Sequence, residues 1–407
     1  MKQHYIFLLA LTWMVLACSG MEKQENSSEE FDVEEALEHC KVKLYYSIKN
    51  FQDEKRLPRH IKKGEQHWSG SSINSWTVGF YPGILWKMYD YSKEQEFLLN
   101  AQFYTQMLEP IKSLPWKTHD LGFMMYYSYG LGYEITKNQH YKAVLLEVAD
   151  SLATLYKPEV GIMESWPWMK RKKGWPHTTI IDNMMNLELL FWAAENGGKQ
   201  ILKEIAIAHA LRTRKDFIRE DNSTVHVVVY DSISSKVIKK VTDQGYSDYS
   251  TWSRGQAWGI YGFAKAYQYS GKQEFLETSQ KLADYYLDNL PADLIPYWDF
   301  NAPNIPNEEK DASAASITAS ALFDLSQMVS DSEQSERYFK AGKEILKNLS
   351  SANYLSENSD AFLEKSVGSH AGKQEVGIPI IYADYYYLEA LLKLKEIQNN
   401  EQLVNTN

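Results

Sequence analysis

The chain has 407 residues, with 53 Asp and Glu against 43 Lys and Arg, and a formal net charge of −10 at pH 7. This acidic balance excludes nucleic acid as the expected partner, because phosphate backbones are bound through a basic face. The sequence has 12 Trp and 28 Tyr. These rings suit either a large helical core or a cleft that holds a sugar ring against flat apolar faces.

The N-terminal segment predicts export. Met1 and Lys2 precede a short apolar run from Tyr5 to Ala17, which is typical of a signal peptide over residues 1–17. Cys18 follows directly, so we expect it to become a lipidated (palmitate-bearing) N-terminus, with plain secretion as the alternative. The polar residues 18–31 would then be a tether. The expected location is a membrane-anchored lipoprotein that faces the periplasm or the cell surface.

Residues 32–400 are predicted to form a single all-α domain, followed by a C-terminal tail at 401–407. A first helix should bury Cys40, and with no second cysteine in the mature domain no internal disulfide is expected. Residues 226–230 and 237–241 are expected to form a β-hairpin. Apolar residues recur at helical spacing in six later segments. These segments are 181–192, 257–269, 275–290, 314–328, 335–349 and 385–397.

Motifs that open a helix occur at a regular rhythm, separated by roughly two helices and their loops. They lie near Trp76, Asp120, Asp182, Trp252, Asp311 and Asp384. Six such units closing into a ring predict an (α/α)6 barrel with the inner helix N-termini at one end. The alternative is an α-solenoid, which should repeat its sequence. Because no repeated motif is present, the closed barrel is favoured.

The chemistry is expected to depend on carboxylates. The sequence has no G-x-S-x-G, H-E-x-x-H, CxxC or Walker motif, and its histidines are scattered, so neither a metal nor a cofactor is expected. Asp120 and Asp182 each lie at the start of a helix among apolar residues. One interpretation is that each caps its helix. The other is general acid–base catalysis, which requires burial to raise the pKa.

A third group of residues gathers polar and aromatic side chains before the helix at 257–269. Arg254 offers a planar fork suited to a carboxylate, and Trp252 and Trp258 can flank a ring. A tightly packed structural loop is the alternative. So many polar groups in one turn favour a binding function.

Six segments together resemble the unsaturated glucuronyl hydrolases of glycoside hydrolase family 88. They run in family order between about Trp68 and Leu391, so the resemblance covers the whole domain. The segments are Trp76–Gly83, His119–Phe123, Ile181–Leu187, Gln244–Asp248, Trp252–Trp258 and Tyr382–Tyr386.

The resemblance implies an (α/α)6 barrel that hydrates the C4=C5 double bond left in a terminal uronic acid by a polysaccharide lyase. The resulting hemiketal opens and breaks the glycosidic bond. Asp182 is then the acid that protonates C4 and afterwards the base for water, and Asp120 is the second essential carboxylate. The residues implied to bind the sugar are Trp76, His119, His226, Thr242, Gln244, Trp252, Arg254 and Trp258.

Some positions depart from the family pattern. Tyr249 and Asp243 stand where the family often has Asp and His. Ser366 and Ser369 match part of a sulfate-binding stretch, but Ala371 replaces its lysine and Lys373 lies two residues later. We therefore expect Ser366 and Ser369 to bind substrate and treat sulfate binding as a hypothesis. The basic run 170–173 is either a solvated loop or a source of positive potential for an anionic substrate.

Other functions remain open at this point. An unsaturated rhamnogalacturonyl hydrolase would have the same barrel and reaction type, and His226 with the segment 252–258 favours the glucuronyl group. A non-catalytic glycan-binding lipoprotein would not explain the paired carboxylates. An inverting hydrolase of saturated chains is also possible. The polymer, either a glycosaminoglycan or an ulvan-type polysaccharide, and the oligomeric state, monomer or dimer, are not indicated.

Overall fold

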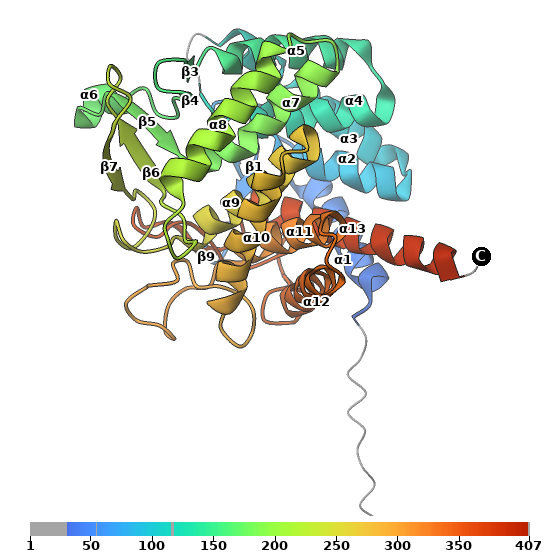
Figure 1. Ribbon diagram of the computed structural model, residues 1–407. Coiled ribbons are helices and arrows are strands. Elements are labelled where there is room, and N and C mark those ends of the chain that lie inside the picture. Colours follow the sequence, from blue (N-terminus) through green and yellow to red (C-terminus); the bar gives the residue numbers. More distant parts are fainter. Residues whose placement is uncertain (1–30, 54, 115–117, 406–407) are drawn as a thin grey trace, which may run out of the picture. The chain divides into compact units, whose positions relative to one another are not determined.

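The computed structural model describes residues 31–405, except residues 54 and 115–117 (Figure 1). The predicted signal peptide, Cys18 and all but the last residue of the tether lie outside the described residues. The last helix continues to Asn405, five residues past the predicted domain end at residue 400. Among the described residues, no helix combines the length and apolarity needed to cross a membrane.

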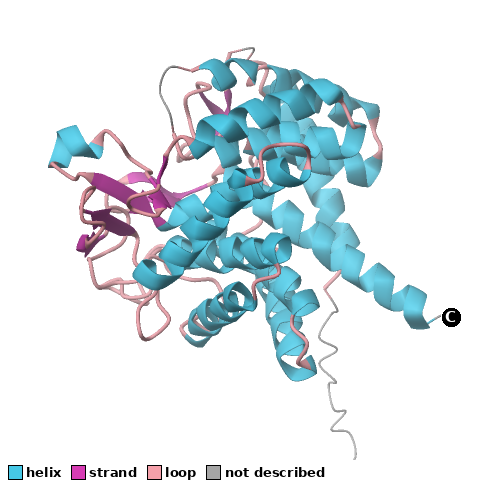
Figure 2. Ribbon diagram, turned by 45° about the horizontal axis from the view of Figure 1, so that its top comes forward, coloured by secondary structure: helices cyan, strands magenta, loops and turns pink. Residues whose placement is uncertain are grey.

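The described chain is built from an inner and an outer ring of helices (Figures 1 and 2). Each inner helix contacts the next, and α13 contacts α2, so the inner ring closes. This closure confirms the predicted (α/α)6 barrel, because the ends of a solenoid do not meet. The inner helices are α2 (Phe80–Ser92), η2 (Gly122–Gly130) with α4 (Leu131–Thr136), η3 (Ile181–Asn186) with α7 (Leu187–Glu195), α9 (Ser253–Ser270), α11 (Ala312–Met328) and α13 (Ile381–Asn405).

Each inner helix is covered by an outer helix that contacts it directly. The inner helix α11 buries 14 of its 17 residues, whereas the outer helix α12 buries 5 of 18. A helix packed on several sides buries nearly all of its faces, in α11 with Ser and Thr as well as apolar residues, whereas an outer helix needs only one apolar stripe. The outer helices are α3 (Gln95–Gln106), α5 (Gln139–Ala153), α8 (Ile201–Phe217), α10 (Gln273–Asp288), α12 (Ser332–Leu349) and α1 (Val33–Asn50), where Cys40 is buried as expected.

Two inner helices begin with irregular turns that the sequence did not predict. The segment η2 is a π-helix, and η3 is a 3-10 helix before the regular helix α7. The prediction of a regular helix from residue 181 was therefore wrong over its first six residues. Such irregular turns are often found at functional sites, because they change the direction of the side chains.

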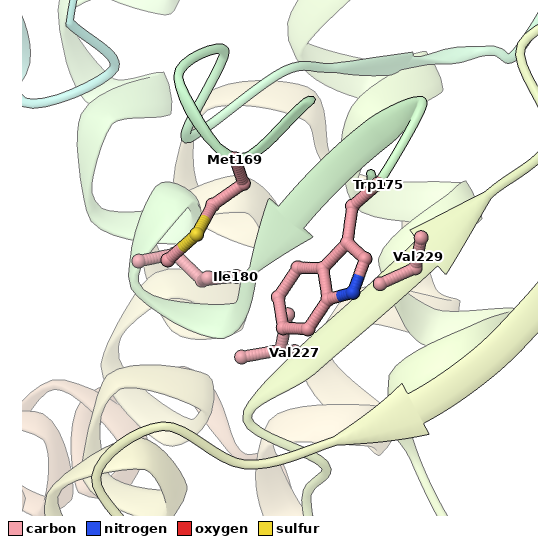
Figure 3. Packing of buried hydrophobic residues seen from close by; sticks show 5 residues of the cluster. All are labelled: Met169, Trp175, Ile180, Val227 and Val229. Atoms are coloured by element: carbon pink, nitrogen blue, oxygen red, sulfur yellow. The ribbon is translucent and has the colours of Figure 1, made fainter. Parts of the chain in front are cut away.

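The predicted hairpin is present as β6 (Val227–Tyr230) and β7 (Val237–Val241), and β5 (His177–Ile180) adds a third antiparallel strand next to β6. Short helix α6 (Met169–Lys173) packs through Met169 on one face of this sheet, beside Trp175, Val227 and Val229 (Figure 3). The remaining short elements are β1 (Leu57–His60), β2 (Ser69–Ser71), η1 (Glu109–Ser113), β3 (Tyr156–Lys157), β4 (Ile162–Met163), β8 (Ser366–Ser369) and β9 (Gln374–Ile378).

The six predicted motifs all lie at the starts of inner helices. Outer and inner helices alternate along the chain from α1 to α13, and each returns antiparallel to the one before it, so the inner helices run in the same direction. Their N-termini therefore meet at one end of the barrel, and the sheet β5–β6–β7 and the hairpin β8–β9 lie at that end. This end carries the candidate site.

Candidate active site

Asp182 lies at the second position of η3, directly after strand β5. The N-cap of η3 is Ile180, and the helix has no side-chain cap, so the capping interpretation of Asp182 was wrong. Its side chain is 14% exposed, and Oδ2 is buried with no hydrogen-bond partner among the described residues. Burial raises the pKa of Asp182 to about 7, even though the Arg254 charge and a hydrogen bond from the Trp258 indole act to lower it.

Asp120 lies just before η2, whose N-cap is Leu121 and which has no side-chain cap, so the capping interpretation fails here too. Its carboxylate is held from two sides. The Thr118 hydroxyl donates to Oδ2 over 2.8 Å, and His119 Nε2 lies 3.2 Å from Oδ1. The negative charge of Asp120 contributes to the raised pKa of Asp182.

The two carboxylates are brought together by the contact between η2 and η3. The Asn186 side chain accepts a hydrogen bond from the backbone N–H of Phe123 over 2.9 Å. At Gly122, an added Cβ would lie 2.5 Å from the Asn186 Cα, so only glycine allows this approach. Asn186 stood within the predicted motif, but its positioning function was missed.

A second unpredicted residue, Ser165, fixes the geometry around both aspartates. Its carbonyl lies 2.8 Å from His119 Nδ1, and its hydroxyl accepts from the Ile180 N–H over 3.1 Å and from the Asn183 amide over 3.2 Å. These bonds connect the loop before η2 to the start of η3. Ser165 lies in no motif, so no sequence signal could have identified it.

His226 faces Asp182 as a neutral hydrogen-bond donor. Its Nδ1 accepts from the backbone N–H groups of Asp243 over 3.0 Å and Gln244 over 3.3 Å, and the Thr242 hydroxyl lies 3.4 Å away. The ring proton is therefore assigned to Nε2, which lies 3.9 Å from Asp182 Oδ2. Burial lowers the pKa of His226 to about 3, so the imidazole is uncharged at neutral pH.

Arg254, at the second position of α9, connects several predicted segments. Its Nη1 donates to Asp311 Oδ2 over 2.7 Å and to the Val367 carbonyl, and Nη2 donates to Gln244 Oε1 over 3.0 Å and the Gly368 carbonyl over 2.6 Å. Four of its five N–H donors thus have partners within the protein. The fork that we expected to bind a substrate carboxylate is occupied in this structure, by Asp311 at Nη1 and by Gln244 at Nη2.

The comparisons with known proteins agree with this arrangement. The family model described as Glycosyl Hydrolase Family 88 matches residues 45–397. The chain belongs to glycoside hydrolase family 88. An "Unsaturated glucuronyl hydrolase" of Formosa agariphila is 36% identical over 97% of this chain and 98% of that protein. An "Unsaturated chondroitin disaccharide hydrolase" of Streptococcus pyogenes is 28% identical over 91% and 93% of the two chains.

A solved structure described as an "unsaturated glucuronyl hydrolase specific for heparin" superposes with a TM-score of 0.86 at 36% identity, covering 90% of this chain and 98% of that one. The resemblance on which the sequence analysis relied is therefore confirmed at the level of family and fold. This chain is a glycoside hydrolase, which leaves the non-catalytic glycan-binding alternative without support.

Aromatic rings form the walls around this family 88 site. The Arg254 guanidinium lies 4.6 Å from the Trp252 ring and 5.3 Å from the Tyr382 ring. The Trp76 ring, 5.0 Å from that of Tyr382, is partly exposed, whereas Trp258 is buried. Part of Trp76 is therefore accessible to a ligand, and Trp258 contributes its indole N–H at Asp182.

The hairpin β8–β9 contacts the site through its backbone. Ser366 is fully buried with no side-chain partner among the described residues, and the Ser369 hydroxyl accepts from the Gly372 N–H over 3.1 Å. The structure joins this hairpin to Arg254 but shows no contact of either serine hydroxyl with the other predicted residues. Binding of substrate or sulfate at these serines stays a prediction.

The two departures from the family pattern differ in their surroundings. The Tyr249 side chain is 91% exposed, whereas the Asp243 carboxylate lies 3.3 Å from Lys173 Nζ. A hollow of about 280 Å³ lies elsewhere, lined in part by Lys157, Lys170 and His177 and by neither catalytic aspartate. Within the described ranges, no group of three or more His, Cys, Asp and Glu is placed to hold a metal ion.

Proposed function

We propose that the chain releases the terminal 4-deoxy-4,5-unsaturated uronic acid from oligosaccharides made by polysaccharide lyases. The observation that carries this proposal is the carboxyl of Asp182, which has a pKa of about 7 and an unpartnered Oδ2 facing the neutral Nε2–H of His226. A group with this pKa can give up a proton at neutral pH and take one back. Membership of glycoside hydrolase family 88 supports the same reaction.

The reaction begins with protonated Asp182, which transfers its proton to C4 of the unsaturated sugar. The C4=C5 electron pair forms the new C–H bond, and the ring oxygen stabilises the positive charge that develops at C5. Water then attacks C5 while the Asp182 carboxylate accepts a proton from it. Asp182 therefore ends the cycle protonated. The product is a hemiketal, which opens and breaks the bond to the next sugar.

The neighbouring groups adjust the pKa of Asp182, and so the balance between its protonated and ionised forms during this cycle. Asp120 raises the pKa of Asp182 and so favours the proton-donating form, and Arg254 acts in the opposite direction and stabilises the carboxylate that forms next. Neutral His226 can donate a hydrogen bond to the anionic carboxylate without competing for its proton. The site therefore supports both protonation states of one residue.

The natural substrate and the location belong to the proposal. Names that include heparin and chondroitin among similar proteins support a glycosaminoglycan source, and an ulvan-type polymer is the second candidate. An unsaturated rhamnogalacturonyl residue is the alternative sugar. We also propose that Cys18 anchors the chain in a membrane. Full-length protein should then sediment with membranes, and a Cys18→Ser variant should not.

The decisive experiment follows the ultraviolet absorbance of the conjugated C4=C5 bond during incubation with lyase-generated disaccharides from several polymers, sulfated and unsulfated. The absorbance should fall with wild-type protein, and Asp182→Asn should abolish the fall. The fastest substrate then identifies the polymer. If unsaturated disaccharides are left unchanged while saturated ones are cleaved, the chain is an ordinary glycosidase and the hydration mechanism is wrong.

A further inference from the structure

A group of exposed cations, which we call the basic cap, lies beside the active site. Segments 157–175 and 231–243, which surround it, together carry eight Lys and Arg against four Asp and Glu, in a chain that is acidic overall. Positive charge is thus concentrated in one region. The basic cap consists of Lys170, Arg171, Lys172 and Lys173 on and at the end of α6, and Lys239 on β7.

The cap is held on a rigid base. Met169 of α6 and the Trp175 ring pack on the sheet formed by β5, β6 and β7 (Figure 3). The ammonium groups of Lys173 and Lys239 each lie 4.6 Å from the centre of the Trp175 ring. A cation against an aromatic face is stabilised by the ring and needs less water around it. The Trp175 ring therefore stabilises both charges where they lie beside it.

Two routes of neighbouring contacts connect the cap to His226, the residue beside Asp182. Lys173 Nζ lies 3.3 Å from Asp243 Oδ1, and the backbone N–H of Asp243 donates to His226. Trp166, which packs against the Met169 and Trp175 cluster, has its ring 5.8 Å from that of His226. Strand β5, which lies between α6 and Asp182 along the chain, is four residues or roughly 13 Å long. A ligand that follows this strand from Asp182 to the cap must span more than one sugar ring.

Most of the cap is free to bind an external anion. Lys170, Arg171 and Lys172 are exposed and form no ion pair among the described residues, whereas Lys173 pairs with Asp243. Lysines on the outer helices are commonly paired, as Lys203 of α8 is with Glu195 over 3.1 Å. Exposed unpaired cations near a cleft attract anionic ligands toward it.

We propose that the basic cap is a distal binding site for the carboxylate or sulfate groups of sugars two or more positions beyond the unsaturated residue. This inference rests on the proposed function. With the terminal sugar at Asp182, a longer chain leaves the site past Trp166 and crosses α6. A disaccharide is too short to reach the cap, so the cap distinguishes substrates by length as well as by charge.

The test compares an unsaturated disaccharide with an unsaturated hexasaccharide from the same sulfated polymer at low salt. In the variant Lys170→Gln/Arg171→Gln/Lys172→Gln, KM for the hexasaccharide should rise about tenfold, with kcat unchanged. KM for the disaccharide should stay the same. Added salt should reduce the difference between wild type and variant. The control variant Lys142→Gln/Lys281→Gln/Lys340→Gln, on outer helices α5, α10 and α12, removes the same charge and should change neither KM.

An equal change of KM for both substrates, or no change for either, overturns the proposal. Unchanged hexasaccharide kinetics together with lost binding to anionic phospholipid vesicles would overturn it in favour of a membrane contact. If wild-type protein consumes no unsaturated sugar at all, the proposed function has failed, and the cap is then judged separately by calorimetry. In that case Asp182→Asn should bind the hexasaccharide more tightly than the same protein with the three cap substitutions.

Discussion

Asp182 at the active-site end of the barrel and Asp324 deeper inside it are exposed to nearly the same extent, 14% and 15% of their side chains. Their pKa values nevertheless shift in opposite directions. Burial raises the pKa of Asp182 to about 7. Burial opposes ionisation of Asp324 as well, but Lys265 and Lys393, at 3.1 and 2.8 Å, lower its pKa.

Asp324 belongs to a buried charge cluster that also contains Glu389. The Glu389 carboxylate lies 3.0 Å from Lys87 and accepts a hydrogen bond from the Tyr261 hydroxyl over 3.0 Å, and its pKa is lowered despite burial. These residues lie eight to thirteen positions into their inner helices, whereas Asp182 lies at the second position of η3.

The comparison shows that the charged neighbours of a buried carboxyl, and not its depth in the barrel, decide whether it stays ionised. Lysines at direct contact keep the deep acids ionised, so that this cluster holds helices together and exchanges no protons. Near Asp182 the arginine is already bound to Asp311, and the histidine stays neutral. The charge of Asp182 is therefore compensated only in part, by Arg254 and the Trp258 indole, and its proton is available for chemistry.

The largest effect on activity is expected from replacing Asp182 with a residue that cannot transfer a proton. Asp182→Asn should lower kcat by about 10³-fold or more, because a positioned acid–base group contributes on this scale. The melting temperature should not fall, since asparagine keeps the size of the side chain and the ionised form is disfavoured in the wild type. Absorbance assays and thermal unfolding measure the two quantities. Residual activity above a tenth of wild type contradicts the assigned function of Asp182.

Breaking the buried charge cluster around Glu389 should lower stability and leave activity unchanged, which is the reverse of the result expected for Asp182→Asn. Glu389→Gln removes the anion between Lys87 and Lys393 and should lower the free energy of unfolding by about 3 kcal/mol. The kcat of the folded protein should remain unchanged. Urea unfolding provides the measurement, and Glu336→Gln, which removes an exposed ion pair with Lys340, is the control expected within about 0.5 kcal/mol of wild type.

Glu375 tests whether charged partners or location in the barrel set the pKa of a buried carboxyl. It lies at the active-site end, like Asp182, but it has ion-pair partners. It contacts Arg59 and His60, whose hydrogen bonds lower its pKa to about 2 although burial opposes this. Glu375→Gln should cost about 1–3 kcal/mol at pH 7. A lowered carboxyl pKa stabilises the fold above the ordinary value of 4.5, and this contribution disappears as pH falls toward 2. Chemical denaturation at pH 7 and pH 3 should therefore show a smaller difference between wild type and variant at pH 3.

The smallest expected effect is a displacement of the pH–rate profile. Since protonated Asp182 starts the reaction, kcat/KM should fall as pH rises through about 7. Asp120→Asn removes a charge that raises the pKa of Asp182, so in the residual activity this limb should move to lower pH. A limb that stays in place would show that another group controls it.

The same pKa predicts the sign of a stability effect. Between pH 3.8 and about 7 the folded protein holds the Asp182 proton, whereas the unfolded chain has lost it. Stability contributed by Asp182 is therefore present below this window and lost as pH rises through it. Asp182→Asn should remove that part of the pH dependence, which urea unfolding at a series of pH values would reveal.

Much of the fold followed from the sequence, because helical periodicity and helix-ending residues act locally. Gly271, with φ of 67°, ends α9 one residue beyond the predicted segment 257–269, and Asp311 caps α11 through the Ser313 N–H. The rhythm of helix-opening motifs predicted the barrel and placed Asp120 and Asp182 at helix starts. Their setting among apolar residues left capping and acid–base catalysis open, and the choice between the two came from the resemblance to a family.

Only the tertiary structure decided how these residues are used. Asn186 positions η2 from a distance of 63 residues along the chain, and Asp311 binds Nη1 of Arg254 from 57 residues away. Capping and catalysis require the same residue type at a helix start, so the sequence could not distinguish them. The pKa of Asp182 depends on which charges fold against it and how much water they exclude, and these are properties of packing that no local pattern encodes.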